Sequence, residues 1–149
     1  MTPKQTGFRG YVTSRAFLGQ RVPQHIQNIV IRDYCQRHGL RYLLSVTEHV
    51  MPNCYMILKQ VMCEILSIEG IVLYSLFQLP EIDRLRSEIY HQLLDSNRII
   101  HAAVENFVIR EKADIARVED IWQVQKIMLI KEKKENTNER DQFFNKIAY

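Results

Sequence analysis

The sequence predicts a single α/β domain built in three layers, with a mostly parallel four-stranded sheet between helices. First, short apolar runs of strand length alternate with amphipathic segments of helical period, and consecutive β–α units form parallel sheets with helices on both faces. Second, a length of 149 residues is typical of one domain, and 46% hydrophobic with 25% charged residues is typical of a globular chain. We expect the domain over residues 1–134 and a polar tail or short helix over 135–149.

The N-terminal half contains two β–α units. The first strand is expected over residues 10–13, and Pro23 predicts a helix start because proline is tolerated in the first helical turn. Gly39 is a suitable C-terminal cap for this helix. The apolar run Tyr42–Val46 predicts the second strand, and apolar residues at helical spacing predict a second helix over 55–66.

The C-terminal half contains the other two units. Residues 71–77 are the strongest strand signal, since β-branched and aromatic residues follow one another without alternation, as in a strand covered on both faces. Helices are expected over 81–94 and 112–133, with a fourth strand over 99–104 between them. The last helix carries more apolar residues than one buried face requires. We therefore expect it to form a homo-oligomer contact, unless the tail folds back to cover it.

A ligand site is expected at the carboxyl ends of the strands, where open parallel sheets bind their ligands. Arg15 and Arg21 flank a glycine-containing loop that leads to a helix N-terminus, an arrangement suited to phosphate or carboxylate groups. Residues 1–41 contain seven basic residues and one acidic residue, which favours an anionic partner over two solvated surface charges. The residues expected to bind the ligand are Arg15, Arg21, Gln24, Asn28 and Gln78.

Three residues near the same edge are candidates for proton transfer. Glu48 and Glu105 could act as general acid and base if their environments separate their pKa values. The alternative is that one carboxylate caps a helix and the other forms a salt bridge. His25 is a further catalytic candidate, although a histidine beside a helix start is more often a structural hydrogen-bonding residue.

The motifs of several site classes are absent. The sequence has no H-x-x-x-H, H-E-x-x-H or paired-cysteine spacing, so we expect no metal. It has no P-loop and no G-x-G-x-x-G segment, so we expect no cofactor. The three cysteines form no C-x-x-C pair and lie in apolar segments, which predicts reduced thiols and a cytoplasmic protein. No apolar run has the length of a membrane span, and the N-terminus has no apolar segment of a signal peptide.

Several short segments resemble one known family. They are Gly10–Arg15, Arg21–Asn28, Ile31–Cys35, Tyr42–Ser45 with Glu48, Glu69–Pro80 and the region of Glu105. These segments are similar to the small sporadic carbohydrate cluster proteins of bacterial surface-polysaccharide gene clusters, over roughly residues 8–125. The resemblance implies a role in lipopolysaccharide or capsule biosynthesis. It implies no particular reaction and no catalytic residues.

A fainter similarity is to the catalytic domains of serine recombinases, the resolvases, which makes the expected fold resolvase-like or flavodoxin-like. Those domains open with a strand containing Gly-Tyr, and their nucleophilic serine stands five residues after that glycine. Arg15 occupies this position here, and Ser14 lies one place early, which in a strand turns it to the other face. Their Leu-Asp-Arg-Leu signature is similar to Ile82–Leu85, which comes late after the third strand, and no helix-turn-helix segment follows. The resemblance therefore implies a shared fold and argues against DNA strand exchange.

These observations lead to one main hypothesis and two alternatives. The main hypothesis is a protein of bacterial surface-carbohydrate biosynthesis that binds a phosphorylated or nucleotide-linked sugar at the strand ends; whether it is an enzyme stays open. One alternative is a non-catalytic partner or regulator of a neighbouring biosynthetic enzyme, and the other is a recombinase-like nucleic-acid-binding protein. Because the net charge is only +3, we expect no nucleic-acid partner under the main hypothesis.

Overall fold

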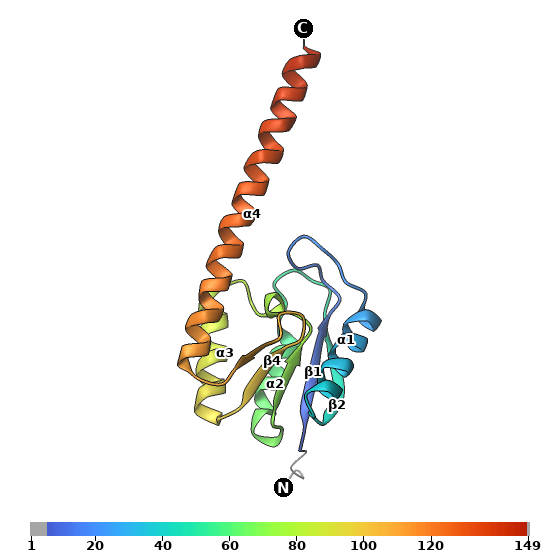
Figure 1. Cartoon of the computed structure of the whole chain (residues 1–149), viewed down its shortest axis with the longest axis vertical. Coiled ribbons are helices and arrows are strands. Elements are labelled where there is room, and N and C mark those ends of the chain that lie inside the picture. The colour runs from blue at the N-terminus through green and yellow to red at the C-terminus, as the bar shows by residue number, and fades with distance from the viewer. Residues whose placement is uncertain (1–5, 149) are drawn as a thin grey trace. The chain divides into compact units, whose positions relative to one another are not determined.

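The computed structural model describes residues 6–148, and its centre is a five-stranded sheet (Figure 1). The strands are β1 (Phe8–Thr13), β2 (Tyr42–Glu48), β3 (Gly70–Leu73), β4 (Ile99–Ala102) and β5 (Phe107–Ile109). Their order across the sheet is β2-β1-β3-β4-β5. β1, β2, β3 and β4 run parallel to one another, and β5 pairs antiparallel with β4.

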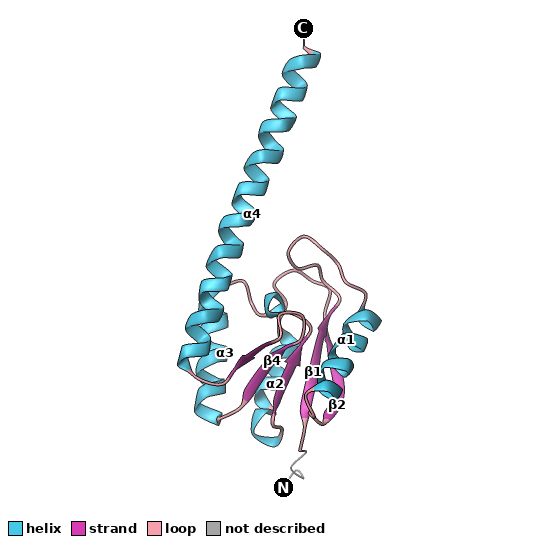
Figure 2. Cartoon of the chain, viewed as in Figure 1, coloured by secondary structure: helices cyan, strands magenta, loops and turns pink. Residues whose placement is uncertain are grey.

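Helices follow the strands along the chain (Figure 2). They are α1 (Gln24–Arg37), α2 (Met56–Cys63), α3 (Asp83–Ser96) and α4 (Lys112–Ile147), with two short 3-10 helices, η1 (Ile65–Ser67) and η2 (Leu76–Gln78). α1 covers one face of the sheet, and α2 and α3 lie on the opposite face (Figure 1). This arrangement follows from right-handed crossovers, because the chain moves in one direction from β1 to β2 and then in the other direction to β3 and β4.

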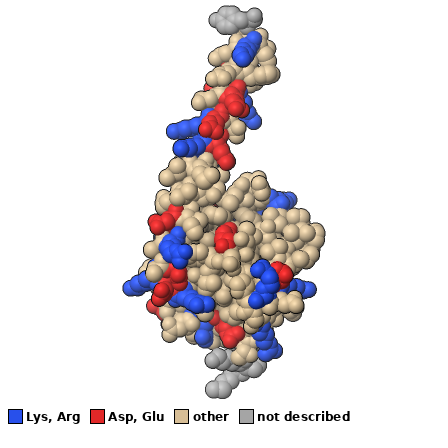
Figure 3. Space-filling model, viewed as in Figure 1, with Lys and Arg blue, Asp and Glu red and all other residues tan. Residues whose placement is uncertain are grey.

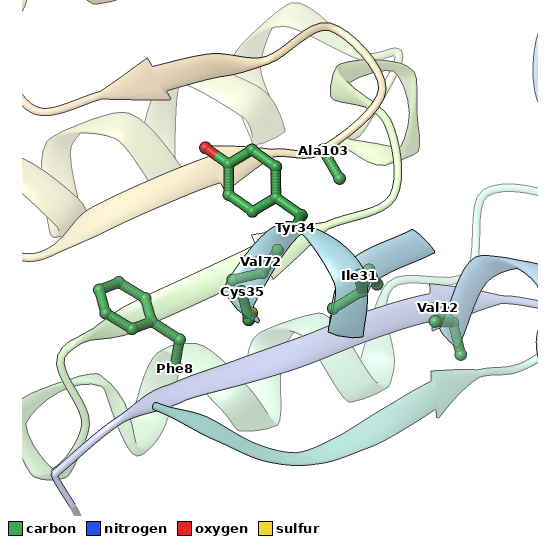
Figure 4. Packing of buried hydrophobic residues seen from close by; sticks show 7 residues of the cluster. All are labelled: Phe8, Val12, Ile31, Tyr34, Cys35, Val72 and Ala103. Carbon is green, nitrogen blue, oxygen red and sulfur yellow. The ribbon is translucent and has the colours of Figure 1, made fainter. Parts of the chain in front are cut away.

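One part of the core lies between α1 and the sheet. Ile31, Tyr34 and Cys35 of α1 recur at helical spacing and are almost fully buried. Figure 4 shows these side chains directed at the strands. The strand and loop residues that complete this cluster are Phe8, Val12, Val72 and Ala103. The packing fixes α1 over β1 and β3, and so fixes the loop that joins β1 to α1.

The predicted α/β fold class is confirmed, with differences in three elements. The sheet has five strands instead of four, because a tight turn at Asn106, where φ is 49°, leads into the very short β5. β3 ends at Leu73 instead of continuing to residue 77. The reason is that Ser75 and Gln78 form a capping box, which starts η2.

The last helix is longer than the expected 112–133. α4 continues to Ile147, since neither glycine nor proline interrupts it. The chain divides into two compact units after Ile115, so most of α4 belongs to the second unit. Because α4 is one continuous helix from Lys112 to Ile147, the expected tail that begins at residue 135 does not fold back over the apolar residues of this helix. Its exposed large apolar residues are Val124, Ile127, Met128, Ile130, Phe143, Phe144 and Ile147. The domain boundary expected after residue 134 stays a prediction.

Within residues 6–148, no helix combines the length and the apolar character needed to cross a membrane.

Candidate functional site

The candidate site is a cavity at the carboxyl ends of the parallel strands. In a sheet with this strand order, the connections leave β1 and β3 toward opposite sides, and ligands bind at that switch point. The loops after β1, β2 and β3 enclose a cavity of about 410 Å³ there. We call it the switch-point cavity. Its lining residues are Arg15, Ala16, Phe17, Arg21, Val50, Pro52, Asn53, Tyr55, Phe77 and Glu81.

Arg15 is held firmly in the wall of the switch-point cavity. Its Nη1 donates to the carbonyl oxygen of Cys54 at 2.8 Å, and its Nη2 donates to the carbonyl oxygen of Gln78 at 3.2 Å. The guanidinium carbon lies 4.4 Å from the centre of the Tyr55 ring, within range of a cation–π interaction. Arg15 thus joins the three loops around the cavity and places a fixed positive charge there.

Arg21 is the second cation at the cavity, and its environment is different. Its side chain is exposed and has no hydrogen-bond or ion-pair partner among residues 6–148. It follows a tight hairpin in which Phe17 and Gln20 exchange two backbone hydrogen bonds of 2.9 and 3.0 Å. The φ values of 51° at Leu18 and 71° at Gly19 are those of a type I′ turn. Arg21 is therefore available to bind an anion.

A buried amide network supports the floor beneath the loops. The Gln78 Oε1 accepts from the backbone N–H groups of Tyr74 and Ser75 at 2.9 and 3.2 Å. Its Nε2 donates to Thr13 Oγ1 at 3.3 Å and to Gln27 Oε1 at 2.7 Å. Gln78 is only 1% exposed, so its amide is fully used within the protein. It joins β1, α1 and the segment that follows β3, and it has no free group for a ligand.

Glu48 is buried at the N-terminus of α2. Its carboxylate accepts from the backbone N–H of Ile57 at 3.1 Å, from that of Leu58 at 3.0 Å and from the Tyr11 hydroxyl at 2.9 Å. Burial alone would raise the pKa of Glu48. The hydrogen bonds from Leu58, Ile57, Tyr11 and the His49 N–H outweigh it, so the pKa lies below the usual range. A saturated, ionised carboxylate in this position is a helix cap.

Glu105 caps a different segment. Its carboxylate accepts from Ser75 Oγ at 2.6 Å and from the backbone N–H of Leu76 at 3.1 Å, at the start of η2. Glu48 and Glu105 share no hydrogen-bond partner in the described part of the chain. The structure therefore does not bring the two expected proton-transfer groups together, and neither lines the switch-point cavity.

The remaining expected site residues lie beside the cavity or away from it. Gln24 is exposed and donates from Nε2 to Ser14 Oγ at 2.6 Å. Asn28 accepts from the Ser45 hydroxyl of β2. His25 is exposed on α1 and does not line the cavity. Their ligand-binding and catalytic roles stay predictions.

The sequence analysis did not predict four residues that shape the site. Gln27 lies in register with Ile31 and Tyr34 on the buried face of α1, and this spacing is a signal for a buried amide. Phe17, Tyr55 and Phe77 line the cavity, but they come from three separate parts of the chain: the loop after β1, the residue before α2, and η2. Their approach depends on the strand order, so no local pattern could reveal it.

The residues described contain no group of three or more histidine, cysteine, aspartate and glutamate side chains able to hold a metal ion. The cysteines are free: Cys35 is buried, Cys54 half-buried and Cys63 exposed. Burial raises the pKa of the Cys35 thiol to about 11. The apolar segments that contain the cysteines therefore bury Cys35 but leave Cys63 exposed.

The sequence matches no protein-family model and no curated protein. Among solved structures, the chain is similar to a resolvase family site-specific recombinase from Streptococcus pneumoniae, with a TM-score of 0.56 and 8% identity. That likeness covers 91% of this chain and 99% of the other. A second similar structure is the N-terminal catalytic domain of TP901-1 integrase, with a TM-score of 0.47, 11% identity and coverage of 85% and 97%. The chain thus has a resolvase-like fold.

These comparisons contradict the main sequence hypothesis. The chain matches no family model, and the structural likeness that carries weight is to a resolvase family site-specific recombinase. The interpretation as a protein of surface-carbohydrate biosynthesis that binds a sugar phosphate or nucleotide sugar is therefore wrong. The physical reason lies in where the matching segments fall. The segments Gly10–Arg15 and Glu69–Pro80 form parts of β1, β3, η2 and their loops. Their similarity to the carbohydrate cluster proteins therefore reflects strand and turn formation and not a shared reaction.

Proposed function

We propose that this chain is a nucleic-acid-binding protein with a resolvase-like fold, and that the switch-point cavity binds a backbone phosphate. The observation that carries the proposal is the pair of arginines at the cavity. Arg15 is fixed by two carbonyl oxygens, and Arg21 is exposed without a partner among the described residues. Arginine offers bidentate donors to phosphate oxygens. The similar Streptococcus pneumoniae protein is described as a site-specific recombinase, an activity whose substrate is nucleic acid.

We propose binding without strand cleavage. A serine nucleophile needs an adjacent group to take its proton. Ser14 Oγ instead accepts from Gln24 Nε2 at 2.6 Å and donates to the Glu48 carbonyl oxygen at 3.4 Å. By the recombinase resemblance, the place of the nucleophile is taken by Arg15, which cannot act as one. The cavity therefore supports recognition of a phosphodiester rather than its cleavage.

The test is the salt dependence of binding to labelled oligonucleotides. Each phosphate contact that a basic side chain makes adds about 0.7–0.9 to the slope of log affinity against log salt. Arg21→Ala should weaken binding about tenfold without changing thermal stability. It should also reduce the magnitude of the salt slope by about 0.7–0.9, the amount expected for one phosphate contact. The matched control is Arg37→Ala, since Arg37 is an exposed arginine of α1 that pairs with Asp33 and does not line the cavity.

Two results would contradict the proposal. One is the absence of binding to any oligonucleotide at low salt. The other is an equal loss of affinity in the Arg21→Ala and Arg37→Ala proteins, because that result would mean non-specific attraction to the whole surface.

A further inference from the structure

The switch-point cavity combines positive charge with aromatic rings. Phe17 and Phe77 line it together with Arg15 and Arg21, and Tyr55 lies beneath Arg15. Proteins that bind single-stranded nucleic acid stack bases on aromatic side chains and hold the backbone with basic ones. Both kinds of contact are thus present within one cavity.

The three rings differ in what they can offer. Tyr55 is buried, its ring is covered by the Arg15 guanidinium, and its hydroxyl accepts from the Glu81 N–H at 3.4 Å. It is therefore part of the floor. Phe17 and Phe77 are half-buried and keep part of their surface in the cavity. Phe17 packs edge-on against Tyr74, with 6.0 Å between ring centres, which leaves the direction of its faces fixed.

The loop that carries Phe17 and Arg21 is held in a costly conformation. A left-handed backbone is sterically disfavoured at a leucine, and Leu18 has a φ of 51°. The two hydrogen bonds between Phe17 and Gln20 maintain the turn. Such strain is typical of loops that are preorganised for a ligand.

The size and charge of the cavity favour one nucleotide over a duplex. A volume of about 410 Å³ is that of a small-molecule pocket. Its lining has two cationic side chains, Arg15 and Arg21, and one anionic side chain, Glu81. On the face that Figure 3 shows, basic and acidic side chains are interspersed and form no continuous basic surface. A base paired within a duplex would have to leave the stack to enter a cavity of this size.

We infer that the switch-point cavity holds one unpaired nucleotide of a single strand, with the base against Phe17 or Phe77 and a phosphate at Arg21. This inference rests on the proposed function, that the chain binds nucleic acid, and it names the class of nucleic acid. The shared chemistry, an aromatic base with a phosphate, also exists in free nucleotides, so the experiment includes one.

The experiment measures the fluorescence anisotropy of labelled single-stranded and duplex oligonucleotides of equal length with the full chain. Single strands should bind at least about tenfold more tightly than duplexes. At least one of Phe77→Leu and Phe17→Leu should weaken single-strand binding about tenfold, and both should leave duplex binding unchanged. Phe77→Tyr keeps an aromatic ring and should retain binding. Phe143→Leu in α4, where Phe143 is exposed, is the matched control.

Thermal melting of each variant separates loss of folding from loss of contact, and the tyrosine variant keeps the test valid if a leucine variant unfolds. Equal binding of duplex and single strand, with no effect of the phenylalanine substitutions, would overturn the inference. The proposed function would still stand if Arg21→Ala weakened both. Adenosine monophosphate should compete only at concentrations far above the oligonucleotide. If it competed equally well, the site would bind free nucleotides and the inference would be wrong.

Discussion

Replacing Glu48 by glutamine tests whether this carboxylate holds α2 in place. The carboxylate is 1% exposed and accepts hydrogen bonds from two α2 N–H groups, the His49 N–H and the Tyr11 hydroxyl. A glutamine has one acceptor oxygen in place of two. Its NH₂ group would face the N–H or hydroxyl donors that the second carboxylate oxygen accepts from in the wild type, and these donors would be left unpaired. Leaving buried donors unpaired costs about 1–3 kcal/mol each. We expect Glu48→Gln to lower the free energy of unfolding by about 3 kcal/mol and the melting temperature by roughly 10 °C.

The pH dependence of this loss identifies its cause. The pKa of Glu48 in the folded protein lies below its ordinary value of 4.5, so folding favours the ionised form. The contribution is fully present above about pH 4.5 and is lost as pH falls through the folded pKa. The difference in unfolding free energy between wild type and Glu48→Gln should therefore be constant near neutral pH and shrink in acid.

Urea unfolding, followed by circular dichroism at several pH values, measures this difference. A loss below about 0.5 kcal/mol, or one that does not change in acid, would refute the helix-cap assignment. A variant as stable as wild type that no longer bound nucleic acid would instead place the Glu48 carboxylate in the functional site, as the sequence suggested.

Three further predictions concern other parts of the chain. Burial, with Arg110 and His38 nearby, lowers the pKa of His101 to about 4 from an ordinary 6.5. The free energy of unfolding should therefore decrease as the pH is lowered from 6.5 to 4, by at most about 1.4 kcal/mol per pH unit. Urea titrations should show no such slope for His101→Asn. Leu18→Asn should raise the melting temperature, because asparagine tolerates the left-handed conformation better by about 1 kcal/mol; an unchanged or lower value would contradict this. Sedimentation should show dimers both for the full chain and for a chain ending at Glu135, since four exposed apolar residues, Val124, Ile127, Met128 and Ile130, precede Glu135 in the sequence. A monomeric full chain would exclude an α4 contact.

The fold could be predicted from the sequence because it depends on local signals. The apolar run at Tyr42 and the helix signals at Pro23 and Gly39 each specify one element, and right-handed crossovers then leave few topologies. The early end of β3 was missed because the capping box of Ser75 and Gln78 falls inside an apolar run. The sequence pattern therefore predicted that β3 exists, while the residue at which β3 ends depends on the capping box of Ser75 and Gln78.

The candidate site was predicted only in part. Arg15 and Arg21 were placed at the correct edge of the sheet, since both follow β1 and its carboxyl end lies at the switch point. Gln78 was placed there too, but its four hydrogen bonds to the protein leave its amide no group for a ligand. The aromatic lining could not be predicted, because Phe17 and Phe77 meet only after β1 and β3 have paired.

The carboxyl edge of a parallel sheet is also the edge at which helices begin, and this explains why its polar residues are ambiguous. Helix N-termini need acceptors for their free N–H groups, so acidic and amide side chains collect there whether or not a ligand binds. Glu48 and Glu105 satisfy that need for α2 and η2. What separates a structural polar group from a binding group is whether the fold already uses its hydrogen bonds. By this criterion Glu48 is used within the protein, whereas Arg21 has no partner among residues 6–148, which is why our proposal of ligand binding at this edge rests on Arg21.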